Sequence, residues 1–268
     1  MHLPDFPAPL GAVSLPVTNH LLRRGLLTDV AGLSLLPGDP TNRLEDIRAD
    51  LFGHGWIEPP PEEQMPVTTG PRGAEVAQID RSGLRILGFW AQKVHINGLV
   101  APDSPDGPLV WISRSSGQAP SNPGRWDTLV AGGRSAAHSI AQTAQLEAWE
   151  EAGIGTDAMV RLHRVREFEV RYVSDRGFHQ ELLAMHDLVL PADFQATCHD
   201  SEIEESARLT LAGLEFRLTD PRQFKFSSYL VLMDLVARCH AAARRSFPWF
   251  ESRNDCADQG YKRRALPP

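Results

Sequence analysis

The spacing of hydrophobic and polar residues divides the chain near residue 76. Before that point, apolar residues recur at helical spacing in two short stretches, which predict helices near residues 18–25 and 41–53. Proline and glycine are then frequent in residues 58–73, a composition typical of a connector. We therefore expect residues 1–75 to form a small α/β domain that packs on the main part of the chain.

Strand-length apolar runs replace the helical spacing beyond Val76. Residues 168–172 alternate strictly between polar and apolar, and residues 181–190 form a second run after a polar turn, so together they predict a β-hairpin. We expect a main domain over residues 76–245 and a polar tail over residues 246–268. The other expected elements are a strand and turn over 88–100, with the turn at Asn97-Gly98, short strands at 109–113 and 126–130, and a helix over 224–240.

One further helix is marked at both of its ends. Ser139 and Gln142 have the spacing of a capping box, and Gly153 stands where a left-handed C-cap residue is expected. The helix is therefore predicted to run from about Ile140 to Ala152, directly after a loop that begins with Gly132-Gly133.

Three carboxylates, Glu147, Glu150 and Glu151, crowd the last turns of this helix. Spacings of three and four residues bring side chains together on one side of a helix, so these like charges repel one another. The helix dipole also opposes negative charge at a C-terminus. A divalent cation such as Mg²⁺ would compensate both effects, because it prefers oxygen ligands and shares its shell with substrate phosphates. A solvated acidic surface is the alternative interpretation of the carboxylates alone.

The glycine loop and the helix together resemble the Nudix box, whose pattern is G-x5-E-x7-R-E-U-x-E-E-x-G-U, with U a bulky aliphatic residue. Two positions depart from the pattern: His138 stands where the first Glu belongs, and Leu146 stands where the Arg belongs. The residues that match are Gly132, Glu147, Glu150, Glu151, Gly153 and Ile154.

The resemblance implies a Nudix fold, an α/β/α sandwich with a mixed sheet. It implies that Glu147, Glu150 and Glu151, with the backbone of Gly132, bind the metal, expected to be Mg²⁺ with Mn²⁺ as an alternative. It also implies that Glu150, Glu151 and Glu202 are the catalytic carboxylates. As a hypothesis, Glu150 or Glu202 positions or deprotonates the attacking water.

Segments outside the box resemble one branch of this family. That branch has an extra N-terminal domain and includes the Nudix half of fungal thiamine pyrophosphokinase-like proteins. It implies hydrolysis of a diphosphate linked to an organic moiety, with a thiamine diphosphate derivative as one substrate, and phosphate contacts by Arg114 and Lys225. The segments that carry this resemblance are 94–98, 109–115, 123–133 and 187–191.

Two other functions remain open at this point. Isopentenyl diphosphate isomerases resemble the same strand and loop sequence, but they need a catalytic cysteine, and no cysteine lies between Met1 and Thr197. The second alternative is a ligand sensor without catalytic activity on a Nudix scaffold. The replaced Glu and Arg of the box favour it, whereas three retained carboxylates that repel one another count against it.

Composition limits which binding partners and which cellular compartment are expected for the protein. The chain of 268 residues carries a net charge of −7, which argues against a nucleic-acid-binding surface. No apolar run is long enough for a membrane span, and no secretory signal is evident at the N-terminus. The three cysteines are widely spaced and odd in number, as expected of thiols in a reducing compartment. We expect a cytoplasmic monomer or homodimer that acts on a small diphosphate.

Overall fold

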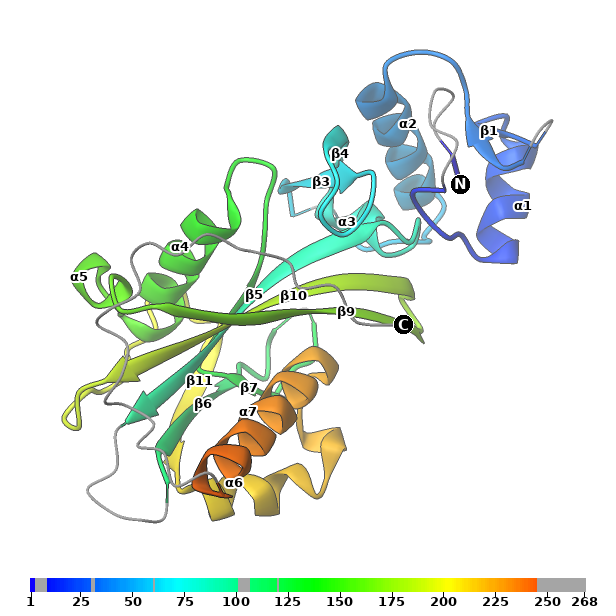
Figure 1. Ribbon diagram of the computed structural model, residues 1–268. Coiled ribbons are helices and arrows are strands. Elements are labelled where there is room, and N and C mark those ends of the chain that lie inside the picture. The colour runs from blue at the N-terminus through cyan, green and yellow to red at the C-terminus, as the bar shows by residue number, and fades with distance from the viewer. Residues whose placement is uncertain (3–8, 30–31, 60, 101–106, 120, 245–268) are drawn as a thin grey trace, which may run out of the picture.

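The computed structural model describes residues 1–2, 9–29, 32–59, 61–100, 107–119 and 121–244 (Figure 1). A seven-stranded sheet lies at its centre, with the strand order β11-β6-β5-β10-β9, while β7 pairs with β6 and β8 pairs with β5. β10 runs parallel to β5 and every other pair in this sheet is antiparallel, so the sheet is mixed, as predicted. The strands are β5 (Trp90–Val100), β6 (Leu109–Ser115), β7 (Trp126–Thr128), β8 (Val130–Gly133), β9 (His163–Ser174), β10 (Gly177–Leu190) and β11 (Ile203–Leu209).

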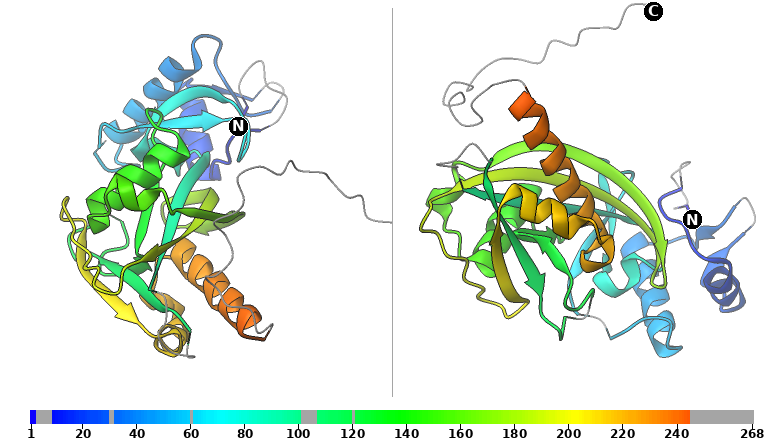
Figure 2. Two further views of the ribbon diagram at one scale, coloured as in Figure 1. Left: turned by 60° about the vertical axis from the view of Figure 1, so that its left-hand side comes forward. Right: turned by 90° about the horizontal axis from the view of Figure 1, so that it is seen from below.

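Helices cover both faces of this sheet, because its central strands are apolar on both sides (Figures 1 and 2). On one face, Val94 and Ile96 of β5 pack with Ala144 and Ala148 of α4. On the other face, Ile112 of β6 belongs to a cluster that is completed by α6 and α7. The predicted α/β/α sandwich is therefore confirmed. The helices of the sandwich are α4 (Ile140–Ala152), α5 (Thr156–Met159), α6 (Leu211–Leu218) and α7 (Phe226–Arg244), with a 3₁₀ turn at Pro221–Gln223.

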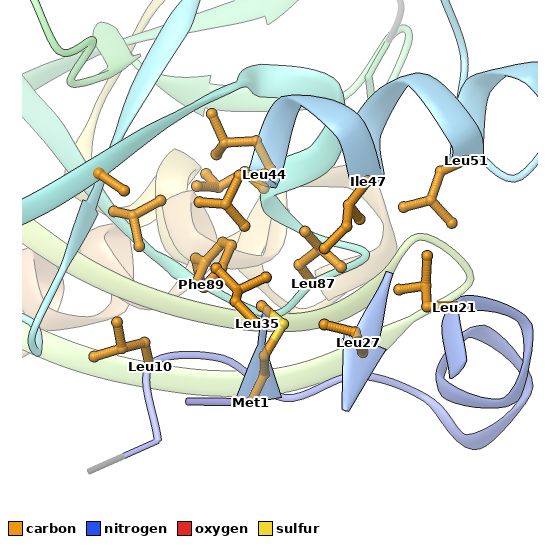
Figure 3. Close-up of a cluster of buried hydrophobic side chains, with 14 of the residues drawn as sticks. Met1, Leu10, Leu21, Leu27, Leu35, Leu44, Ile47, Leu51, Leu87 and Phe89 are labelled. Carbon is orange, nitrogen blue, oxygen red and sulfur yellow. The ribbon is translucent and has the colours of Figure 1, made fainter. Parts of the chain in front are cut away.

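The N-terminal part of the chain has a hydrophobic cluster of its own, which runs from Met1 to Phe89 (Figure 3). Leu44, Ile47 and Leu51, at helical spacing on α2, are fully buried in it. The division into domains at residues 75 and 245 stays a prediction. The elements of this part are α1 (Leu15–Arg23), β1 (Leu27–Thr28), β2 (Ser34–Leu35), α2 (Pro40–Gly53), β3 (Gln64–Thr68), β4 (Glu75–Asp80) and α3 (Arg81–Leu84).

The β3–β4 hairpin and α3 lie between the two N-terminal helices and the central sheet (Figure 1). Arg72, in the turn between β3 and β4, makes ion pairs of 2.6 Å with Glu167 and with Glu169 of β9. The side-chain amide of Gln180 in β10 donates a hydrogen bond of 2.7 Å to the backbone carbonyl of Gly88. The N-terminal part is thus joined to the sheet at its β9–β10 hairpin.

Several predicted elements are confirmed. α4 spans Ile140–Ala152, its capping box is present, and Gly153 is left-handed with φ of 66°. The hairpin is β9–β10, with Ser174 opposite Gly177 at its turn. No helix among the described residues is long and apolar enough to span a membrane.

Other predictions were wrong. Asn97-Gly98 makes no turn, because both residues lie inside β5. Glycine is needed at position 98 for packing, since a Cβ there would lie 2.3 Å from Cδ2 of Leu129. The expected connector over 58–73 contains β3. The predicted tail over 246–268 lies outside the described residues.

Candidate active site

Gly132 and Glu147 form a close contact between backbone and carboxylate where the glycine loop lies against α4. β8 ends at Gly133, and α4 turns back so that Glu147 lies against it. A Cβ built on Gly132 would lie 1.9 Å from Oε1 of Glu147. Because any side chain at 132 would displace this carboxylate, the first glycine of the box forms the space that Glu147 occupies.

The carboxylates of α4 sit in an environment that disfavours their negative charge. Burial, and then the charge of Glu150, raise the pKa of Glu147 to about 7. Glu151 is 3% exposed, and burial with the charges of Asp127 and Glu147 raises its pKa well above the usual range. Its Oε2 accepts a hydrogen bond of 2.7 Å from the amide of Ala131, which holds the side chain against the glycine loop. Arg81 acts on Glu147 and Lys225 acts on Glu151 in the opposite direction, but they do not offset these effects.

Glu150 and Glu202 lie at the more open side of this cluster. Glu150 is half-buried, and burial with the charges of Asp200 and Glu202 raises its pKa. Glu202 is exposed, directly before β11, and its carbonyl accepts a hydrogen bond of 2.8 Å from the amide of Ser116. The charge of Glu202 also contributes to the raised pKa of Glu147. The structure therefore brings all four predicted carboxylates into electrostatic contact.

Lys225 approaches the same place from the residue before α7. Its Nζ lies 2.9 Å from Oδ2 of Asp127, a buried carboxylate on β7. Burial alone would raise the pKa of Asp127, but Lys225 and hydrogen bonding from Ser228 lower it overall, so the pair is ionised. Lys225 is the predicted substrate residue that the structure brings to the glycine loop.

A cavity of about 360 Å³ opens beside Gly132 and Gly133. Its lining includes the glycine loop, Asp127 of β7 and Lys225, together with residues of the β9–β10 hairpin. Cations outnumber carboxylates among the lining residues, so the cavity suits an anion. The charged lining residues are Arg81, Arg85, Lys93, Asp127, Asp175, Arg176 and Lys225.

Aromatic rings form part of the hairpin wall. Tyr172 stacks on His179 with ring centroids 4.2 Å apart, and it lies 4.6 Å from the ring of Phe226. The Tyr172 hydroxyl donates to Glu181, which also pairs with Lys93 at 2.7 Å. Although burial opposes it, this environment holds the pKa of Glu181 well below its usual range. The cavity thus combines positive charge with flat aromatic surface.

Arg114, the other predicted substrate residue, is not among the residues that line this cavity. Its Nη2 lies 2.8 Å from Glu205 and 3.6 Å from Glu204 on β11. Its guanidinium also lies over the ring of Trp126, with Cζ 5.7 Å from the ring centroid. A phosphate contact by Arg114 stays a prediction and would require exchange of these partners.

The two altered box positions leave a loop that is braced by other residues. The Nε of Arg134 donates to the carbonyl of His138 at 2.8 Å, and its Nη1 donates to Gln92 on β5 at 2.8 Å. The His138 ring itself is 3.1 Å from the Ser135 hydroxyl. The amide of Ala136 donates to the carbonyl of Gln64 in β3 at 2.7 Å. The N-terminal part therefore supports the loop that carries the site.

A hard divalent cation fits the donor set. Glu147, Glu150 and Glu151 offer carboxylate oxygens, which Mg²⁺ and Mn²⁺ prefer. The raised pKa values of these groups are those expected where a cation is needed to balance charge. Gly132 supplies the close backbone approach.

The sequence did not predict the cationic and aromatic residues that line the cavity beside the glycine loop. Arg81 in α3, Arg85 directly after α3 and Lys93 in β5 are near one another in the chain, whereas Tyr172 comes from the distant strand β9. Each has an ordinary local context, and none matches a motif. Only pairing of β10 with β5, and docking of the segment after α3 on the hairpin, brings them together.

The fold and the site define a class of protein: an α/β/α sandwich in which a glycine loop and a capped helix hold clustered carboxylates beside a cationic cavity. The NUDIX domain model matches residues 95–230, about half of the chain, and the protein belongs to this family.

Two plant proteins named Nudix hydrolases are similar to most of this chain. Nudix hydrolase 24, chloroplastic, of Arabidopsis thaliana is 27% identical over 214 residues, which cover 80% of this chain and 58% of the relative. Nudix hydrolase 20, chloroplastic, of the same plant is 28% identical over 202 residues, which cover 75% and 54%. The chain thus spans just over half the length of these relatives. The crystal structure of DR0079 from Deinococcus radiodurans superposes with a TM-score of 0.47 at 21% identity, over 66% of this chain and 99% of that one.

Proposed function

We propose that this protein is a metal-dependent pyrophosphohydrolase that cleaves a diphosphate linked to an organic moiety and yields a monophosphate. The observation that carries the proposal is the cluster of Glu147, Glu150 and Glu151 beside the glycine loop, where Gly132 lies against Glu147 and also lines a cavity rich in cations. Membership of the Nudix family and similarity to two proteins named Nudix hydrolases support the same activity.

In this proposal, Glu147, Glu151 and the backbone of Gly132 hold Mg²⁺ or Mn²⁺, with Glu150 beside them. The metal supplies charge neutralisation and orientation of the diphosphate. Lys225 adds a positive charge on the cavity side, with Asp127 fixing its position.

The attacking water is positioned by Glu150 or Glu202, the carboxylates on the open side of the cluster. The chosen carboxylate takes a proton from the water as the water oxygen bonds to phosphorus. The bridging P–O bond breaks with its electron pair on the departing phosphate. The raised pKa of Glu150 suits this step, because it brings the basicity of the carboxylate closer to neutral pH.

For the organic moiety, we propose a flat ring of the size of a thiamine diphosphate derivative. The stacked pair of Tyr172 and His179, with Phe226 beside it, offers a surface for such a ring next to the charged part of the cavity. The resemblance of the flanking segments to the thiamine-linked branch supports this substrate. The cytoplasmic location stays a prediction, and both plant relatives are named chloroplastic.

The test is turnover of a panel: thiamine diphosphate and its oxidised forms, ADP-ribose, NADH, a dinucleoside polyphosphate and isopentenyl diphosphate. Glu151→Gln is run beside the native protein, because glutamine keeps the acceptor for Ala131 while it removes the charge. Glu45→Gln, at an exposed position on α2, is the matched control. We expect Mg²⁺-dependent release of a monophosphate from one compound, lost in Glu151→Gln and kept in Glu45→Gln. No turnover anywhere, together with a metal-independent rise in melting temperature from one ligand, would instead indicate a sensor.

A further inference from the structure

Arg85 stands out among the cations of the cavity because it forms no ion pair with any residue that the structure describes. Arg81 pairs with Glu63 at 2.7 Å, Lys93 with Glu181 at 2.7 Å, and Lys225 with Asp127 at 2.9 Å. In contrast, no hydrogen bond or ion pair holds the guanidinium of Arg85 within the part of the chain that the structure describes. Arg85 is half-buried and lines the cavity.

The surroundings of Arg85 disfavour an unbalanced positive charge. Burial lowers the pKa of Arg85, and the nearby charges of Arg81 and Arg176 act in the same direction. Glu181 acts in the opposite direction, but this carboxylate already pairs with Lys93. Holding a cation in such a place costs stability unless a ligand balances it, which is typical of residues kept for function.

The backbone around Arg85 is fixed against the sheet, so its position in the cavity is built into the fold. A Cβ on Gly177, at the start of β10, would lie 2.5 Å from the carbonyl oxygen of Arg85. Gly177 has φ of 122°, a conformation that favours glycine. Three residues after Arg85, the carbonyl of Gly88 accepts the hydrogen bond from Gln180. The β9–β10 hairpin therefore locks the segment that carries Arg85.

From this geometry we infer that Arg85 binds an anionic group of the substrate, the phosphoryl group on the side of the organic moiety. The inference rests on the proposed function, in which the carboxylates of α4 serve the other phosphoryl group. Arg85 lies near Tyr172, on the aromatic side of the cavity, and a planar guanidinium binds two phosphate oxygens at once. A residue ahead of the segment that matches the NUDIX model, residues 95–230, thereby completes the substrate site.

The substrate class follows from this arrangement. The substrate carries at least two linked phosphoryl groups. The phosphoryl group nearer to the ring contacts the side chain of Arg85 and not the carboxylate cluster. A substrate with a single phosphate would leave Arg85 unbalanced. We therefore expect diphosphates to bind and monophosphate products to leave, because the product lacks one of the two anchors.

The test measures binding of inorganic pyrophosphate to the metal-free protein by titration calorimetry, which needs no turnover. The variants are Arg85→Gln, Arg85→Lys and, as a matched control, Arg161→Gln at an exposed position after α5. We expect Arg85→Gln to weaken binding by about tenfold or more, as for loss of a charge-assisted pair. Arg85→Lys should retain part of the affinity, and Arg161→Gln should retain all of it.

Melting temperatures separate binding from structure. Removing an unpaired cation that lies near Arg81 and Arg176 should leave the melting temperature of Arg85→Gln unchanged or raised. The inference would be overturned if Arg85→Gln lowered the melting temperature, Arg85→Lys restored it, and the pyrophosphate affinity of Arg85→Gln stayed unchanged. Arg85 would then have a structural role. The inference would also be overturned if the native protein did not bind pyrophosphate at all. Arg85-dependent binding in a protein that hydrolyses nothing in the panel would support the anion site while refuting the hydrolase.

Discussion

Replacing Gly132 by alanine perturbs the site by one methyl group at its tightest point. The new Cβ would lie 1.9 Å from Oε1, 2.0 Å from Cδ and 2.3 Å from Cγ of Glu147. An ordinary contact begins at 3.4 Å, so Glu147 has to move by about 1.5 Å or adopt another rotamer. The backbone at 132 is not left-handed, so the change itself adds no backbone strain.

This displacement is large for a metal ligand, whose distances vary by only about 0.2 Å in a working site. The expected loss in kcat/KM is therefore at least tenfold, corresponding to about 1.4 kcal/mol. Overpacking typically costs about 1–3 kcal/mol of stability, so the fold should survive with a lowered melting temperature.

Gly133→Ala is the matched control, because its Cβ would meet nothing closer than Nη2 of Arg81 at 3.6 Å. The assay is Mg²⁺-dependent turnover with Mn²⁺ binding followed by electron paramagnetic resonance. We expect Gly132→Ala to lose both and Gly133→Ala to keep both. Unchanged Mn²⁺ affinity and turnover in Gly132→Ala would refute the placement of the metal at Glu147.

Three further predictions concern charge. In the metal-free protein, the pKa of Glu147 is raised from 4.5 to about 7, so the folded state binds more protons than the unfolded state in this window, and stability should fall as pH rises through it. The free energy of unfolding in urea should fall by at most about 3 kcal/mol over this pH range, and Glu147→Gln should abolish the fall. A free energy of unfolding that does not change with pH in the native protein would contradict the raised pKa. Glu202→Gln should lower kcat while Mn²⁺ affinity stays the same, and a loss of Mn²⁺ binding would make Glu202 a ligand instead. Asp127→Asn should reduce the free energy of unfolding by about 3–5 kcal/mol, because it leaves Lys225 without its carboxylate. The double variant Asp127→Asn with Lys225→Met should recover part of this loss. If the losses of the two single variants simply add in the double variant, the two residues are not coupled.

Local chemistry explains which elements the sequence could predict. α4 was predicted to the residue because its capping box and its left-handed Gly153 are signals contained within the helix ends. The β9–β10 hairpin was predicted because strict alternation and a polar turn are adjacent in the chain. Asn97-Gly98 gave a misleading signal, since its turn preference is overridden by pairing of β5 with β10 and by packing on Leu129.

The candidate site likewise contains residues that the sequence could predict and residues that it could not. The carboxylates of α4 share one helix face, so their spacing alone predicted that they lie together. Arg85 and Tyr172 meet across 87 positions of sequence, through contacts of the β9–β10 hairpin with the segment after α3. Such contacts depend on tertiary packing and leave no local pattern. The aromatic and cationic wall could therefore be found only in the folded chain.

The central claim is that water cleaves a diphosphate at the carboxylates of α4, and turnover in ¹⁸O-labelled water tests it most directly. The products of the active panel compound are analysed by mass spectrometry for the native protein and for Glu151→Gln, with Mg²⁺ and with EDTA. We expect one ¹⁸O atom per cleavage, in a single phosphate product, only with Mg²⁺ and only in the native protein. Cleavage that persists in EDTA or in Glu151→Gln, or that incorporates no label, would contradict it.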